Sequence, residues 1–149
     1  MDRARDAGAR LLCGGGIPRA GVPPGGHYLE PTVFADVAAD SALACEELFG
    51  PVLAILPWDD EAALLADIHR LDVGLTAAIW TTDLARAHRL AREIDAGFVW
   101  INEVGKHFLG APYGGVKQSG IGRDECFGEM LSFTREKNVH VSLRQVGRS

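Results

Sequence analysis

The segment GLTAAIWTTDLARAHRLAREIDAGFVWIN, residues 74–102, is the most informative about the fold, because two apolar runs enclose a stretch with helical periodicity. Thr76 to Trp80 and Gly97 to Ile101 are short and apolar, as buried strands are. The stretch between them, Asp83 to Asp95, repeats apolar residues on one helical face, namely Leu84, Ala87, Leu90, Ala91 and Ile94. Strands joined by such a helix run parallel, so the segment predicts a β-α-β unit.

The same pattern extends toward the N-terminus. Val52 to Pro57 is a third apolar run, and Glu61 to Asp72 follows with Leu64, Leu65, Ile68 and Leu71 on one helical face. Asp59 or Asp60 is placed to cap this helix, and Gly74 to end it. The alternation of strands and helices therefore predicts an α/β fold with a parallel βαβαβ core.

The two ends of the pattern lead into loops and a tail. Clusters of Gly and Pro at residues 14–26 and 110–122 predict loops. After them, Val139, Val141 and Leu143 alternate with polar residues in the two-residue period of a half-exposed strand. We expect a main domain over residues 1–136 and a tail, residues 137–149, whose strand joins an edge on a neighbouring subunit.

Composition excludes several classes of protein. The 149 residues, 47% of them hydrophobic, suit one domain, and a net charge of -5 argues against nucleic-acid binding. No apolar run approaches the roughly 18 residues of a membrane span, and the charged start lacks the apolar stretch of a secretion signal, so we expect a cytoplasmic protein. The cysteines, Cys13, Cys45 and Cys126, form no CxxC pair and indicate neither disulfides nor a metal site.

Nucleotide-binding and catalytic motifs are scarce. The sequence contains no GxGxxG, GxxxxGK[ST], HExxH or GxSxG pattern. In parallel sheets, ligands bind beyond the carboxyl ends of the strands, which makes the loop after Asn102 a candidate site. Asn102 itself is expected to end a strand through side-chain hydrogen bonds.

Five segments resemble a known family in consecutive order. They are GHYLEPTVFADV (26–37), EELFGPV (46–52), GLTAAIWTTD (74–83), AGFVWIN (96–102) and APYGGVKQSGIGRDE (111–125). Together they are similar to the C-terminal part of the aldehyde dehydrogenase superfamily, and the resemblance runs from about Gly8 to Leu143. It implies part of a catalytic domain that oxidises an aldehyde to a carboxylic acid with NAD or NADP, followed by an oligomerisation-type strand.

The resemblance assigns cofactor contacts to two residues. Glu47 is the second glutamate of EELFGPV, which in the family binds the hydroxyls of the nicotinamide ribose. A carboxylate has the lone pairs to accept two adjacent hydroxyls. Phe49 is similar to the aromatic residue that packs beside the nicotinamide. The alternatives are a surface charge for Glu47 and a buried core side chain for Phe49.

The resemblance also places the loop Glu103 to Leu109 along the aldehyde tunnel. His107 and Phe108 are the predicted wall residues, with simple loop packing as the alternative. The segment Tyr113 to Arg123 carries glycines near basic side chains, but we interpret it as structural support and not as a phosphate site.

The catalytic residues of the family lie in motifs upstream of this segment, so we predict no catalytic residue here and no activity of the chain alone. Cys45 is interpreted as a small apolar filler, and so are Cys13 and Cys126. Three hypotheses remain open: a longer enzyme whose other part is encoded upstream of Met1, a non-catalytic short protein that binds a full-length relative through its tail strand, and a remnant without function.

Overall fold

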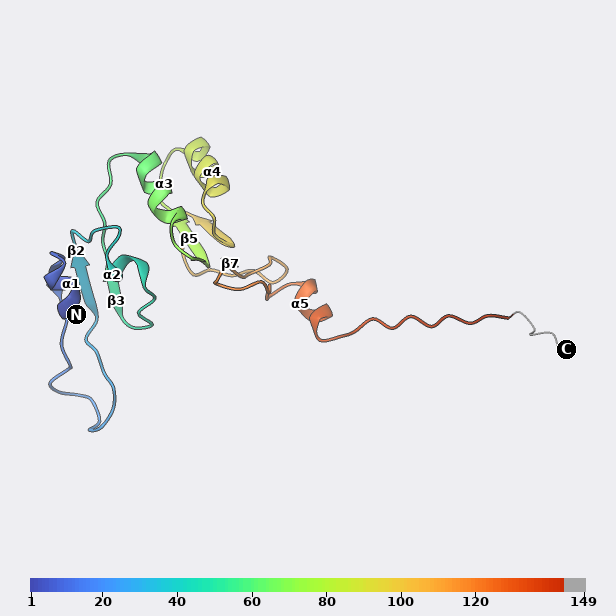
Figure 1. Cartoon of the computed structure of the whole chain (residues 1–149), viewed down its shortest axis with the longest axis horizontal. Helices are drawn as coiled ribbons and strands as arrows, with labels where there is room; N and C mark the ends of the chain where they lie inside the picture. The colour runs from blue at the N-terminus through green and yellow to red at the C-terminus, as the bar shows by residue number, and fades with distance from the viewer. Residues whose placement is uncertain (144–149) are drawn as a thin grey trace. The chain divides into compact units, whose positions relative to one another are not determined.

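The computed structural model describes residues 1–143, and the chain divides into two compact units (Figure 1). The first unit is Met1–Leu71 and the second begins at Asp72. The elements of the first unit are α1 (Asp2–Asp6), β1 (Arg10–Cys13), β2 (Thr32–Ala35), α2 (Ala42–Cys45), β3 (Val52–Ala54) and α3 (Glu61–His69). Those of the second are β4 (Val73–Gly74), β5 (Thr76–Ile79), α4 (Leu84–Glu93), β6 (Phe98–Ile101), β7 (Val116–Lys117) and α5 (Phe127–Ser132).

The first unit is built on a mixed sheet of order β1-β2-β3. β1 pairs with β2 antiparallel, and β2 pairs with β3 parallel, with Thr32 opposite Val52. The core lies where this sheet meets α1: Phe34 is fully buried and packs with Val37 and Ala4. Thr32 is also buried, and its hydroxyl accepts from Gly15 N and donates to the Glu30 carbonyl, so its polar group is satisfied.

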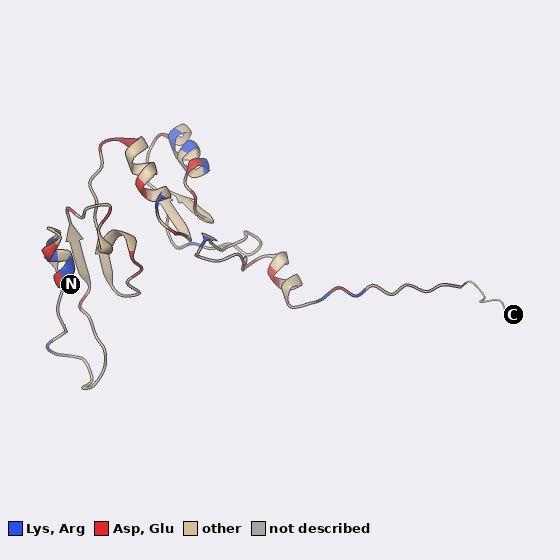
Figure 2. Cartoon of the chain, viewed as in Figure 1, with Lys and Arg blue, Asp and Glu red and all other residues tan. Residues whose placement is uncertain are grey.

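The second unit contains the predicted β-α-β segment. β5 and β6 are parallel neighbours in register from Thr76 opposite Phe98 to Ile79 opposite Ile101, and α4 connects them. Ile79, Ala87, Leu90 and Trp100 are the buried apolar side chains of this unit. The predicted apolar face of α4 is buried in part: Ala87 and Leu90 are buried, whereas Leu84 is 64% exposed. Figure 2 shows that basic residues recur along the same helix.

The α/β fold with parallel strands is confirmed, but the βαβαβ order is divided between two sheets. The run predicted as a strand at 52–57 is present as β3, and its hydrogen-bonded neighbour is β2 rather than β5. The prediction overlooked the strand at 32–35, which is only four residues long and carries no alternation. Residues 55–57 continue beyond β3 without strand structure.

Side-chain caps fix where α3 and α4 begin. Asp60 accepts from Ala63 N at 2.7 Å at the start of α3, and Asp83 accepts from Arg86 N at 2.9 Å at the start of α4. The prediction that Gly74 ends α3 is wrong, because α3 ends at His69 and Gly74 lies in β4, opposite Val116.

Glycines in the second unit allow backbones to approach closely. A side chain at Gly97 would collide with the carbonyl of Gly114, and one at Gly74 would collide with the carbonyl of Asp95. The structural interpretation of the segment 113–123 agrees with this arrangement, since a bridge between Tyr113 and Asp124 closes it. These glycines allow backbone segments of the second unit to pack closely against one another.

The described part of the tail, residues 137–143, has no helix or strand structure and is exposed. Val139 and Val141 are 72% and 69% exposed, so the expected half-burial does not occur within this chain. The remaining residues of the predicted tail, 144–149, lie outside the described part. Pairing with a neighbouring subunit stays a prediction. Among residues 1–143, no helix is long and apolar enough to cross a membrane.

Candidate functional site

Glu47 and Phe49 lie in a turn of the first unit, residues 46–50, between α2 and β3. Both are exposed: Phe49 has 94% of its surface accessible, which contradicts a core position within this chain. Phe49 also has a φ of 45°, in the left-handed region that residues other than glycine rarely adopt. The turn thus presents an aromatic ring outward on a constrained backbone.

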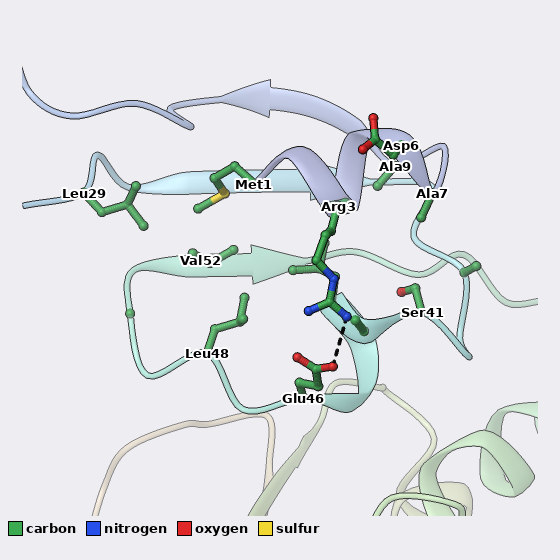
Figure 3. Close-up of a pocket in the computed structure, with 15 residues that line it drawn as sticks. Met1, Arg3, Asp6, Ala7, Ala9, Leu29, Ser41, Glu46, Leu48 and Val52 are labelled. Carbon is green, nitrogen blue, oxygen red and sulfur yellow. Dashed lines mark hydrogen bonds and ion pairs between the residues drawn. The ribbon is translucent and has the colours of Figure 1, made fainter.

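Only one end of the 46–50 turn is held by a side chain. Glu46 caps the C-terminus of α2 and pairs with Arg3 at 3.3 Å, whereas Glu47 makes no hydrogen bond or ion pair within residues 1–143. Figure 3 shows Arg3 reaching from α1 toward Glu46 across a hollow. The hollow has a volume of about 500 Å³, and Glu46 and Leu48 line it while Glu47 and Phe49 do not. Sequence reasoning did not predict this hollow.

His107 and Phe108 lie in the second unit, in the loop of residues 103–109 that follows β6. β6 ends at Ile101, and the side chain of the next residue, Asn102, bonds Thr81 twice: it accepts from Thr81 N and donates to the Thr81 carbonyl, each at 2.9 Å. The predicted role of Asn102 as a strand-ending residue is therefore confirmed. It fixes the point at which the 103–109 loop leaves the sheet.

His107 packs into a cluster of aromatic rings. Its ring centroid lies 4.4 Å from that of Tyr113, 5.9 Å from Trp100 and 6.0 Å from Phe98. Trp100 also donates its Nε1 hydrogen to the Lys106 carbonyl at 2.8 Å. The strand β6 therefore holds the loop through ring stacking and through one hydrogen bond.

The Nδ1 atom of His107 lies 3.0 Å from a carboxylate oxygen of Glu125. About one third of each side chain is exposed. Sequence reasoning missed Glu125, because it is 18 positions away and no motif connects it with His107. Phe108 is 54% exposed and lies under the ammonium of Lys106, at 5.4 Å.

Other candidates from the sequence do not form a site. Cys13 and Cys45 are exposed, so the prediction that they fill the interior is wrong for this chain. The Cys45 thiol donates to the Ala39 carbonyl at 3.3 Å. Arg123 uses its guanidinium on the carbonyl of Gly122, which agrees with a structural role for that segment. Among residues 1–143, no cluster of three His, Cys, Asp or Glu side chains could hold a metal ion.

The chain matches the model of the aldehyde dehydrogenase family over residues 1–139. It is 51% identical over 143 residues to the aldehyde dehydrogenase tropH of Talaromyces stipitatus, covering 94% of this chain and 28% of that protein. It is 42% identical over 146 residues to the betaine aldehyde dehydrogenase of Sinorhizobium fredii, covering 98% of this chain and 30% of that protein.

Solved structures give the same result. The NAD+ complex of an aldehyde dehydrogenase from Bacillus cereus superimposes with a TM-score of 0.82 at 34% identity, covering 96% of this chain and 28% of that one. An indole-3-acetaldehyde dehydrogenase mutant of P. syringae, in complex with NAD+ and IAA, gives 0.77 at 40% identity, covering 85% and 25%. The chain thus spans less than a third of the length of the relatives it matches.

Proposed function

This chain belongs to the aldehyde dehydrogenase family, and on that premise we propose that it supplies a cofactor contact and part of the aldehyde wall of an NAD(P)-dependent enzyme. The observation that carries the proposal is the family match over residues 1–139, to relatives that include enzymes solved with NAD+. The intact enzyme would oxidise an aldehyde to a carboxylic acid.

The 46–50 turn fits the cofactor contact. Glu47 is exposed and its carboxylate has no other partner in the described residues, so both oxygens can accept hydrogen bonds from adjacent ribose hydroxyls. Phe49 offers a free aromatic face two residues away. Fixing the sugar orients the nicotinamide, which accepts hydride when bound.

The 103–109 loop fits the aldehyde wall. It leaves the carboxyl end of β6, where ligands of parallel sheets bind, and it exposes Val104, Phe108 and Leu109 beside the imidazole of His107. A mostly apolar surface with few polar groups is typical of a small-molecule site. His107 and Phe108 would contact the aldehyde.

The chain alone is proposed to be inactive. The covalent route needs a cysteine nucleophile and a glutamate that activates water, and the resemblance places both upstream of these residues. Loss of such a group typically costs several orders of magnitude in rate.

Absorbance of NAD(P)H at 340 nm, followed with a panel of aliphatic and aromatic aldehydes, tests this proposal. We expect no aldehyde-dependent signal from the 149-residue chain, and aldehyde oxidation when the chain is joined to an upstream portion that carries the cysteine motif. A signal from the chain alone that disappears in Cys45→Ser would make Cys45 the nucleophile and overturn the assignment.

A second function is favoured by the exposed tail: a non-catalytic protein that associates with a full-length relative or with itself. Val139, Val141 and Leu143 leave 69% to 91% of their surface open, which an edge strand of another chain would cover. Size-exclusion chromatography with light scattering tests it. A monomer at micromolar concentration, unchanged by deleting residues 137–149 and by co-expression with a full-length relative, would exclude this function.

A further inference from the structure

Glu125 holds the 103–109 loop at two points. Its carboxylate lies 3.0 Å and 3.2 Å from Nδ1 of His107, and its backbone carbonyl accepts from Gly110 N at 2.7 Å, directly after the loop. The first contact is made by the side chain and the second by the main chain. One residue therefore fastens the loop both near its middle and at its end.

The position of Glu125 is itself strongly determined. Its φ of 59° lies in the left-handed region, which a glutamate adopts only when the surroundings hold it there. Its backbone N donates to a carboxylate oxygen of Glu129 at 2.6 Å, and the preceding residue, Asp124, forms a two-way backbone bridge with Tyr113. These contacts tie Glu125 to α5 and to the aromatic cluster.

The contact with Glu125 also fixes the orientation of the His107 ring. A carboxylate can only accept, so the Nδ1 atom of His107 carries the hydrogen. Tyr113 lies against the ring at 4.4 Å, and Phe98 is nearly parallel to it, at 17°. Rotation of the imidazole would break the hydrogen bond and the stacking together.

We propose that Glu125 is a positioning residue that locks His107 and thereby fixes the shape of the 103–109 loop. The consequence for substrates rests on the proposed function, in which this loop lines the aldehyde path. Glu125 then acts on aldehyde selection without touching the aldehyde. The exposed side chains that it indirectly places are Val104, Phe108 and Leu109.

Limited trypsin digestion of the 149-residue chain tests the locking role without any activity measurement. Trypsin cleaves after Lys106, which is exposed and directly precedes His107. We expect Glu125→Leu to accelerate this cleavage about tenfold, because a loosened loop opens more often. The matched control is Glu93→Leu, which removes a carboxylate from an exposed ion pair with Arg89 on α4 and should leave cleavage after Lys106 unchanged.

A conservative variant distinguishes local loosening of the 103–109 loop from unfolding of the whole chain. Cleavage after Arg89, within α4, reports general unfolding. If this cleavage also rises in Glu125→Leu, the proposal is tested with Glu125→Gln instead, which keeps one acceptor oxygen and the side-chain size. Glu125→Gln should raise cleavage after Lys106 less than Glu125→Leu and leave cleavage after Arg89 unchanged. Cleavage after Lys106 at the wild-type rate in both Glu125 variants would overturn the proposal.

Kinetics of the intact enzyme test the consequence for substrates. In Glu125→Leu we expect the KM for the aldehyde to rise about tenfold while the KM for NAD stays within about twofold. Equal changes in both constants, or none, would overturn the role in aldehyde selection. If the wild-type enzyme oxidises no aldehyde, the proposed function fails, and the trypsin result still decides whether Glu125 locks the loop.

Discussion

The 46–50 turn and the 103–109 loop are held in opposite ways. The turn exposes Glu47 and Phe49, and within residues 1–143 its one side-chain ion pair, between Glu46 and Arg3, is exposed. The loop is fastened by stacking, by the Trp100 hydrogen bond and by Glu125. Exposed ion pairs contribute little, whereas buried rings contribute several kcal/mol. The loop is thus held by several contacts within this chain, whereas the turn is held by few.

A large loss of stability is expected where two backbone segments pack closely beneath the loop. Gly97→Ala would drive a methyl group into the carbonyl of Gly114, so the backbone at the start of β6 must move. We expect a loss of about 3 kcal/mol in local stability, measured as faster amide hydrogen exchange in residues 98–101 by mass spectrometry.

Gly122→Ala is the matched control for this substitution, because the added methyl group meets no atom within 4 Å. Its hydrogen exchange should equal that of the wild type. Equal exchange in Gly97→Ala would show that the close approach of β6 to Gly114 is not required.

Removing one aromatic side chain from each region tests whether the two regions differ in packing. Trp100 is 8% exposed and Phe49 is 94% exposed. Trp100→Ala should lower stability by about 3 to 5 kcal/mol, and Phe49→Ala should change it by less than about 0.5 kcal/mol. Thermal unfolding followed by circular dichroism measures both. A Phe49→Ala variant as unstable as Trp100→Ala would mean that the turn is packed in solution.

A smaller effect is expected where the loop leaves the sheet. Asn102→Ala removes both hydrogen bonds to Thr81 and places alanine at a φ of 55°. We expect a loss of about 1 to 2 kcal/mol and faster hydrogen exchange at Thr81 N. Asn102→Asp, which keeps the acceptor oxygen, should recover protection at Thr81 N; if it does not, the side-chain bond is not what protects that amide.

Local features of the fold were predictable from the sequence, and features that depend on distant partners were not. The strands at 76–80 and 97–101 and the cap Asp60 follow from periodicity and capping within a few residues. The pairing of β3 with β2 was missed, since parallel pairing joins segments about 20 residues apart and periodicity does not specify the neighbour.

The same limit applies to the candidate site. The resemblance identified Glu47, Phe49, His107 and Phe108 from their motifs, but no motif connects His107 with Glu125, which depends on a left-handed backbone at residue 125. The sequence also does not determine whether Phe49 is buried or exposed, and the structure shows that it is exposed. Burial and contacts between distant residues are products of tertiary structure.

In the proposed function the exposed 46–50 turn is a cofactor contact, and the KM for NAD of the intact enzyme tests this role most directly. Glu47→Gln keeps the side-chain size but gives up the charge and one acceptor, which we expect to cost about 1 to 3 kcal/mol in cofactor binding or in hydride transfer. The neighbouring variant Glu46→Gln, which weakens only the pair with Arg3, is the control. We predict a raised KM for NAD or a lowered kcat in Glu47→Gln alone, and unchanged constants with both NAD and NADP would contradict the account.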